Sequence, residues 1–200
     1  MDEYLVLDFE TEAIENRPKY PPHPVGVALS WPDGKTEYLA WGHPTENNCD
    51  EVAAKRLVRH AVQKYPVVMH NAKFDLEVLQ KWAGYAPAWN RWGDTMLLAF
   101  LDNPHSDTLA LKPLAEKLLG LPPEERDMVR DWLVEHGVER KGTKGWGRSI
   151  AKAPGGLVGK YAIGDVVRTR KLHDLLYQRV RDAGMLAAYE RERKLIPVMI

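Results

Sequence analysis

Short runs of apolar residues near the start of the chain have the length and composition of β-strands. The runs at 4–9 and 25–31 are rich in apolar, β-branched and aromatic residues, and the run at 36–41 follows the second after a Pro-Asp-Gly turn signal. The runs at 25–31 and 36–41 are therefore predicted to form a hairpin. The apolar run at 66–69 is predicted to be a buried strand, and 89–93 to be another strand.

Beyond residue 50 the apolar residues recur at intervals of three and four, which predicts helices. In 50–64 the repeating positions are Val52, Ala53, Leu57 and Ala61. Capping residues and glycines delimit further helices at 71–82 capped by Asn71, 94–101 capped by Asp94 or Thr95, 109–119 ending before Gly120, 124–136, 157–183 and 185–200. The glycine-rich stretch 137–156 is predicted to be a loop. A hairpin followed by alternating strands and helices predicts an α/β fold, with a mixed central β-sheet flanked by helices.

Composition and charge exclude several classes of protein. The 200 residues contain 28 Lys plus Arg and 28 Asp plus Glu, so the formal net charge is zero. A protein that coats long duplexes through net charge alone is therefore not expected. A protein that grips a short strand end is still compatible, because such binding depends on where the charges lie. A single cysteine, Cys49, excludes an intrachain disulfide and a zinc–thiolate cluster. No apolar run approaches the roughly 18 residues of a membrane span, and the first residues lack the basic segment of a secretory signal. We therefore expect a cytoplasmic protein with no membrane partner.

Two acidic residues lie unusually close together in the first predicted strand. Because side chains alternate along a strand, Asp8 and Glu10 share one face, and Leu7 and Phe9 share the other. Neighbouring carboxylates on an inner strand repel each other, so one must bind a proton or a cation must lie between them. The alternative is a solvated strand end that leads into a turn.

Two more acids occur on predicted helices. Asp75 lies in the first turn after the strand at 66–69, where an acid also favours the helix dipole. Tyr161 and Asp165 are four residues apart and so share one face of a largely apolar helix. A buried Asp needs a partner, which is either a metal ion or a structural pair with Tyr161 or Arg168.

The order of these acids resembles the DEDD superfamily of 3′–5′ exonucleases. The position five residues before Asp165 is Lys160 and not the histidine of the histidine subgroup, so the resemblance is to the tyrosine subgroup. More of the chain resembles the proofreading exonuclease domain of phage and bacterial family A DNA polymerases, namely the segments 94–104, 111–120, 166–172 and 190–199.

The resemblance implies a ribonuclease H-like three-layer fold and a domain division. Residues 1–184 would form the exonuclease domain, and 185–200 a helical connector toward a polymerase region that this chain lacks. The apolar run at 195–200 looks cut in mid-element, so we expect the natural chain to continue. The resemblance also implies a polymerase domain, in cis or in trans, as the protein partner, and a bacterium or a phage-infected cell as the setting.

The resemblance also implies a role for each acid in hydrolysis with two Mg²⁺ or Mn²⁺ ions. Asp8 would bridge both ions, and Glu10 and Asp165 would complete the site of the ion that activates water. Asp75 would hold the second ion, largely through water, and Tyr161 would orient the attacking water. Glu10 would also contact the 3′ hydroxyl. The expected substrate is a single-stranded 3′ end of DNA or a frayed primer terminus, and the product is a nucleoside monophosphate.

Further residues are candidates for holding the strand. Asn71 and Phe74 match positions that contact substrate in the family, and Phe9 and Thr11 flank the acids. Phe9 could instead belong to the core, and Thr11 could be only a turn hydroxyl. The segment 139–160 carries a local formal charge of +5 and one aromatic between glycines; its candidate contacts are Lys141, Lys144, Trp146 and Arg148. A solvated loop or a docking surface would give the same composition.

Other functions remain open at the level of sequence. An exoribonuclease of the same superfamily would have the same acids, because the 2′-hydroxyl is recognised by other contacts. A non-catalytic nucleic-acid clamp is disfavoured because all four acids and Tyr161 are present. A docking role could accompany any of these functions.

Overall fold

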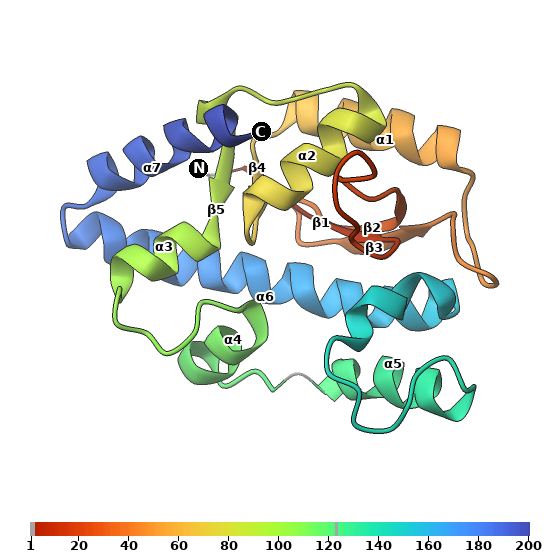
Figure 1. Ribbon diagram of the computed structural model, residues 1–200. Helices are drawn as coiled ribbons and strands as arrows, with labels where there is room; N and C mark the ends of the chain where they lie inside the picture. The colour runs from red at the N-terminus through yellow and green to blue at the C-terminus, as the bar shows by residue number, and fades with distance from the viewer. Residues whose placement is uncertain (1–2, 123) are drawn as a thin grey trace.

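The computed structural model describes residues 3–122 and 124–200, and the side chains of 124–126 are outside that description. A five-stranded mixed sheet forms the centre, with the strand order β3-β2-β1-β4-β5 (Figure 1). Its strands are β1 Leu5–Thr11, β2 Pro24–Ser30, β3 Thr36–Ala40, β4 Val67–Met69 and β5 Trp92–Asp94. The β2–β3 hairpin predicted from the turn signal is confirmed, and β4 and β5 add to the sheet in parallel.

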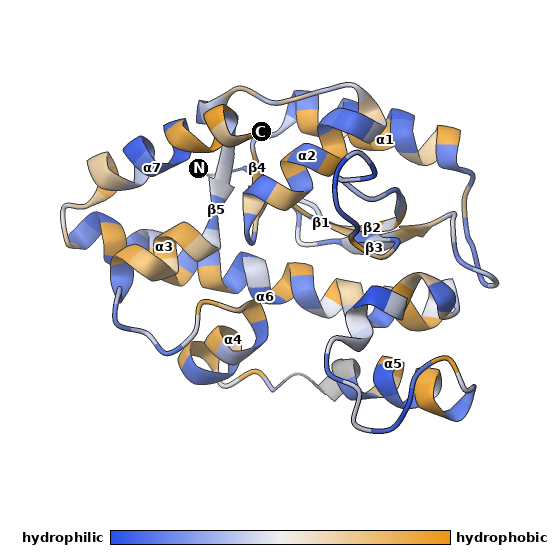
Figure 2. Ribbon diagram, in the orientation of Figure 1, coloured by the Kyte–Doolittle hydropathy of each residue, from blue (hydrophilic) through white to orange (hydrophobic). Residues whose placement is uncertain are grey.

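Helices cover both faces of this sheet, which confirms the predicted α/β fold with a mixed sheet (Figure 1). The helices are α1 Glu51–Lys64, α2 Ala72–Ala83, α3 Thr95–Asp102, α4 Leu111–Leu119, α5 Glu124–Glu135, α6 Gly155–Asp182 and α7 Leu186–Met199, with short 3₁₀ helices η1 Trp89–Arg91 and η2 Trp146–Lys152. Figure 2 shows hydrophobic and hydrophilic residues alternating along these helices, as expected when one face of each helix packs on a core.

Strand β1 separates two hydrophobic cores. Leu5, Leu7 and Phe9 pack with α1 and α2, whereas Tyr4 and Val6 pack with α5 and α6. The even-numbered positions of β1 therefore face the long helix α6. Asp8 and Glu10 continue that face beyond Val6, toward the carboxyl end of the strand, so the strand's alternation directs both carboxylates at α6.

Two local predictions were wrong. Residues 89–91 form a 3₁₀ helix, so the strand there is limited to β5. The stretch 137–156 is not all loop, because it contains η2 and the start of α6 at Gly155. The helix predicted over 50–64 is confirmed as α1; Val52 and Leu57 are exposed, and its buried face carries Ala61, one of the repeating positions, with Ala54, Val58 and Val62. Burial on that face depends on the register with the sheet, which a short apolar repeat does not determine.

The position predicted to cap α2 is correct, but the capping group is not. Asn71 stands at the N-cap with a left-handed backbone (φ 61°), and its side chain makes no capping hydrogen bond. Asp94, at the end of β5, accepts hydrogen bonds from the backbone N–H groups of Asn71 and Ala72 at 3.0 and 2.9 Å. Asp94 also caps its own helix α3 by accepting from Met96 N at 2.8 Å. One buried carboxylate thus fixes the starts of two helices.

Candidate metal centre

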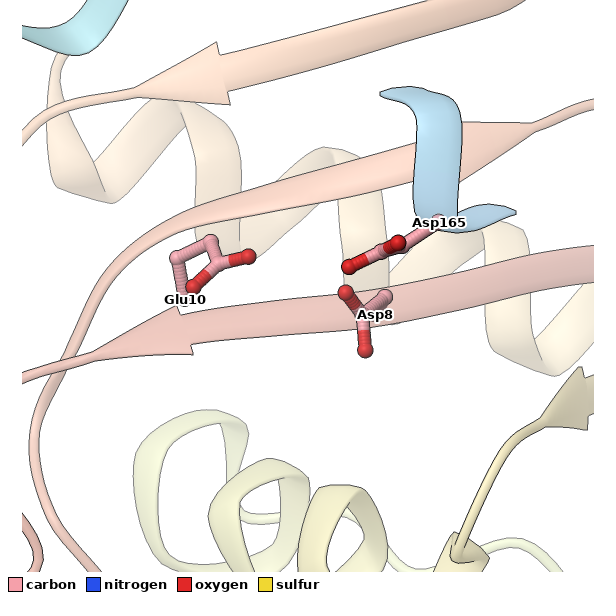
Figure 3. Close-up of side chains that lie close together, drawn as sticks. All are labelled: Asp8, Glu10 and Asp165. Carbon is pink, nitrogen blue, oxygen red and sulfur yellow. The ribbon is translucent and has the colours of Figure 1, made fainter. Parts of the chain in front are cut away.

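Three carboxylates from two elements converge on the α6 face of the sheet. Asp8 and Glu10 come from β1 and Asp165 from α6, and one carboxylate oxygen of each lies within 4.8 Å of the other two (Figure 3). Glu10 is 8% exposed and Asp165 is 4% exposed, while Asp8 is half-buried. All three donors are carboxylate oxygens, which suit a hard divalent cation such as Mg²⁺ or Mn²⁺.

Asp75 lies beside this cluster without joining its three oxygens. Its carboxylate accepts a hydrogen bond from the backbone N–H of Phe9 at 3.0 Å, so it is held against β1 between the two strand acids. Asp75 is 2% exposed, and this burial raises the pKa of its carboxyl group. Repulsion from the charge of Asp8 raises the pKa further. The two predicted helix acids, Asp75 and Asp165, therefore reach β1 from opposite faces of the sheet.

Burial and mutual repulsion disfavour the ionised forms of these acids in the absence of a cation. Burial raises the pKa of Asp8 to about 7, with a further contribution from Asp165. The pKa of Glu10 is raised well above its usual range by burial and then by Asp8 and Asp165. A divalent cation bound to these carboxylate oxygens would offset their mutual repulsion, so the three side chains fit a metal ion.

Two basic side chains contact Asp165. Lys112, from α4, forms an ion pair with its Oδ2 atom, and Arg168, from the next turn of α6, lies with a guanidinium nitrogen 3.6 Å from Oδ1. Arg168 also donates to the carbonyl of Pro122 at 2.7 Å, which ties α6 to the segment before α5. The structural pairing of Arg168 with Asp165 considered from the sequence is thus present, beside the carboxylate cluster. Lys112 was not identified from the sequence, because nothing in a lysine on a short helix indicates that it reaches another helix.

Tyr161 lies one turn before Asp165 and is packed between other side chains. The Lys112 ammonium nitrogen lies 4.0 Å from the centre of its ring. The ring of Trp146, from η2, meets it edge-on with centroids 6.0 Å apart. Tyr161 is therefore held at the rim of the carboxylate cluster by groups from α4 and η2, and this is also where the segment 139–160 approaches the site.

The candidate strand-binding residues have different environments. Phe9 is 4% exposed and packs edge-on against Trp82. Its side chain therefore belongs to the hydrophobic core, which was the alternative to a substrate contact. Thr11 is 8% exposed and its hydroxyl donates to the carbonyl of Glu12 at 2.9 Å. Asn71 is exposed and Phe74 is half-buried at the start of α2, so these two remain accessible beside Asp75.

The basic segment is partly ordered against the protein. Lys141, Lys144 and Arg148 are exposed, and Arg148 lies 3.9 Å from Glu139. Ser149 donates to the same carboxylate at 2.6 Å. Trp146 is half-buried against Tyr161 and is not displayed freely on a loop. Arg148 thus lies on η2, Lys141 and Lys144 lie in the turns that precede it, and η2 packs beside the acids through the contact of Trp146 with Tyr161.

No helix among the described residues is both long and apolar enough to cross a bilayer. Cys49, half-buried, is the free thiol of this chain.

Comparisons with known proteins agree with this architecture. Over 134 residues, 66% of this chain, the sequence is 28% identical to DNA polymerase I of Treponema pallidum (strain Nichols), of which the match spans 12%. The structure of Brucella melitensis NrnC matches 98% of this chain and 82% of its own with a TM-score of 0.65 and 19% identity. The POL domain of Pol1 from M. smegmatis, in complex with DNA primer-template and dNTP, matches 94% of this chain and 25% of its own with a TM-score of 0.56 and 17% identity.

The solved structures are less than 25% identical to this chain and show the fold alone, which is the ribonuclease H-like fold expected from the order of the acids. The family described as "3'-5' exonuclease" matches residues 3–181, which is most of the chain and includes all four acids and Tyr161. The chain therefore belongs to the 3′–5′ exonuclease family of the DNA polymerase I type, within the DEDD exonuclease superfamily.

Proposed function

We propose that this protein removes nucleoside monophosphates from the 3′ end of single-stranded DNA by two-metal-ion hydrolysis. The observation that carries the proposal is the convergence of Asp8, Glu10 and Asp165, whose oxygens lie within 4.8 Å of one another, with Asp75 held against the same strand. The chain belongs to a nuclease family, and its cluster offers carboxylate oxygens as metal ligands. Both facts support hydrolysis of a phosphodiester over nucleic-acid binding without cleavage.

Each residue has a proposed role that matches its position. Asp8, Glu10 and Asp165 would hold the cations, with Asp75 completing the site from the α2 side. Bound cations would supply electrostatic stabilisation of the attacking and leaving oxygens. Tyr161 would orient the attacking water, because it precedes Asp165 by one turn on the same face of α6. Glu10 would contact the 3′ hydroxyl, and Asn71 and Phe74, at the start of α2, would meet the terminal nucleotide.

The choice of DNA rests on the relatives. The curated relative is a DNA polymerase, and one structural relative was solved with a DNA primer-template. The second candidate is an exoribonuclease of the same superfamily, because the same acids would serve either nucleic acid. A very short strand is favoured in that case, since a structure of Brucella melitensis NrnC bound to pGG matches 98% of this chain with a TM-score of 0.62. A short RNA strand is the alternative substrate. A frayed primer terminus and a polymerase domain, in cis or in trans, remain the proposed partners for the DNA reaction.

The test is a strand-trimming assay with wild-type protein and Asp8→Ala, in Mg²⁺ or Mn²⁺. A 3′–5′ exonuclease converts a 5′-labelled single strand into a ladder of shorter labelled products, and it releases the label of a 3′-labelled strand as a mononucleotide in the first step. We expect both results for the wild type. We expect a loss of at least about 100-fold for Asp8→Ala, because the variant lacks a carboxylate that holds the cations.

Matched substrates and a matched variant complete the assay. Asp33→Ala, which removes an exposed carboxylate in the β2–β3 turn, should trim at the wild-type rate. DNA and RNA strands of identical sequence, assayed in parallel, decide between the two substrates. Equal activity of wild type and Asp8→Ala, or products that show cleavage from the 5′ end, would refute the exonuclease proposal.

A further inference from the structure

A basic side chain lies within the acidic cluster. The Lys112 ammonium pairs with Asp165 Oδ2, and the same nitrogen lies 4.0 Å from the centre of the Tyr161 ring. The side chain is only 12% exposed. A lysine that is mostly withdrawn from water needs a compensating partner, and the partner here is a carboxylate of the candidate metal centre.

The fold holds this lysine in place from outside the cluster. Lys112 is the second residue of α4, and α4 packs against α6, which carries Asp165 and Tyr161. The segment that leads into α4 is fixed by a hydrogen bond between the His70 ring and the carbonyl of Leu109 at 3.0 Å. His70 itself directly follows β4, next to β1 in the sheet. The position of Lys112 therefore follows from packed elements and does not depend on the ion pair alone.

Lys112 and Arg168 are not equivalent, although both contact Asp165. Arg168 approaches Oδ1 and is also bound to the carbonyl of Pro122, away from β1. Lys112 approaches Oδ2, and one oxygen of the same carboxylate lies within 4.8 Å of an oxygen of Asp8 and of an oxygen of Glu10. Lys112 therefore places a positive charge directly on the three-carboxylate cluster.

We propose that Lys112 is a built-in counter-ion that neutralises the carboxylate cluster when no metal is bound and competes with the divalent cation for Asp165. The proposal rests on the function proposed above and concerns the same centre. An ammonium and a divalent cation cannot share one carboxylate oxygen without strong repulsion, so metal loading must move the ammonium away from Oδ2. Because the ammonium also covers the Tyr161 ring, the same displacement uncovers the residue proposed to orient the attacking water.

Competition of this kind predicts that removal of the lysine charge strengthens metal binding. We would titrate Mn²⁺ into the protein without nucleic acid, by calorimetry and by the thermal midpoint, for wild type, Lys112→Met and Lys117→Met. Lys117 lies on the same helix, is exposed and serves as the matched control. Lys112→Met should bind Mn²⁺ at least about tenfold more tightly than the wild type, as expected for two coupled binding events. Lys117→Met should match the wild type.

The metal-free state gives an independent readout. Without its counter-ion the cluster should be less stable, so Lys112→Met should unfold at a lower temperature than wild type in EDTA and should gain more from Mn²⁺. Should Lys112→Met prove unfolded in EDTA, Lys112→Gln, which can keep a hydrogen bond to Asp165 without the charge, takes its place with the same expected gain in affinity.

Unchanged or weaker Mn²⁺ binding by the uncharged variant would overturn the Lys112 proposal. This failure is distinguishable from a failure of the exonuclease proposal, because metal binding is measured without substrate, while strand trimming is judged by Asp8→Ala.

Discussion

At the scale of single residues, burial and repulsion between carboxylates disfavour the ionised forms of the site acids, and a bound cation would offset both effects. Asp8, Glu10 and Asp75 all have a raised pKa, chiefly because burial disfavours their charged forms. Nearby carboxylates raise it further: Asp165 acts on Asp8, and Asp8 acts on both Glu10 and Asp75. In the metal-free protein these groups retain protons that the unfolded chain would release. Protons and metal ions therefore compete for the same oxygens, and metal binding should release protons.

This competition predicts a falling metal-free stability as the pH rises. An acid whose pKa is raised on folding stabilises the folded state fully below its unfolded pKa of about 4, and that contribution is lost as the pH rises through its folded pKa. For Asp8 the folded value is about 7, so the loss spans pH 4 to 7. In EDTA, the Tm of wild type relative to Asp8→Asn should fall by about 5 °C between pH 5 and pH 8.

The Asp8→Asn reference is needed because other groups act in the opposite direction. Burial lowers the pKa of His70 to about 4, so His70 reduces stability as the pH falls below its unfolded value of about 6.5. The difference between the two proteins removes this contribution. Addition of Mn²⁺ at pH 8 should restore the wild type and not Asp8→Asn. A difference in Tm that does not change with pH would contradict the assigned role of burial at Asp8.

At the scale of elements, helix starts and a basic turn surround the acids. Asp94 joins the starts of α2 and α3, and α2 carries Asp75 one turn from that start. On the other face, η2 brings Trp146 onto Tyr161 and leaves Lys141, Lys144 and Arg148 exposed nearby. We propose that these exposed cations meet the phosphates of an incoming strand.

The basic turn yields a prediction for strand binding. Lys141/Lys144/Arg148→Ala should weaken single-strand affinity and reduce the slope of log K against log salt concentration by about 2, which corresponds to three lost phosphate contacts. The measurement is a salt series of fluorescence-anisotropy titrations on a single strand, in Ca²⁺ or with Asp8→Ala to prevent trimming.

A triple variant on the opposite side provides the control. Lys35, Arg56 and Lys64 are exposed on the β2–β3 turn and α1, away from η2, and their replacement by Ala removes the same net charge. An equal change of slope in both triple variants would show a general charge effect and would rule out the basic turn as a specific contact.

At the scale of the whole molecule, the last helix is part of the packed body. Helix α7 lies against α3 and η1, with Tyr189 2% exposed and Ile196 5% exposed. The Tyr189 hydroxyl accepts a hydrogen bond from Asp94 N at 2.7 Å, and Arg193 binds the carbonyl of Trp92. The same Asp94 caps α2 and α3, so α7 contacts the framework that positions Asp75. The division at residue 184 stays a proposal about domains, while the packing shows that the two parts are in contact.

We predict that a chain ending at residue 184 is folded but destabilised, by about 3 kcal/mol, because it loses buried apolar area and the hydroxyl partner of Asp94. The free energy of unfolding from urea denaturation measures this loss. Tyr189→Phe should account for about 1 kcal/mol of it through the single hydrogen bond. Val198→Ala, at an 84% exposed position, should leave stability unchanged. Equal stability of the 1–184 chain and the full chain would contradict a structural role for α7.

The sequence by itself determined the elements and the acids. Alternation along β1 placed Asp8 and Glu10 on one face, and helical spacing placed Tyr161 and Asp165 on one face, because both periodicities are local properties of the backbone. The order of the acids, together with a tyrosine four residues before the last, indicated the family that the comparisons show. The predictions that failed were also local. The 3₁₀ helix at 89–91 and the helical part of 137–156 lack a regular repeat of apolar residues that would have predicted them.

Only the tertiary structure decided which side chains meet across elements. Asp94, and not Asn71, satisfies the first N–H groups of α2, because the β5 strand end lies next to that helix start. Lys112 reaches Asp165 because α4 packs on α6, a contact between residues 53 positions apart that no local pattern encodes. The sequence therefore identified the four acids, while chain packing brought Lys112 to Asp165 and built the framework that positions the acids.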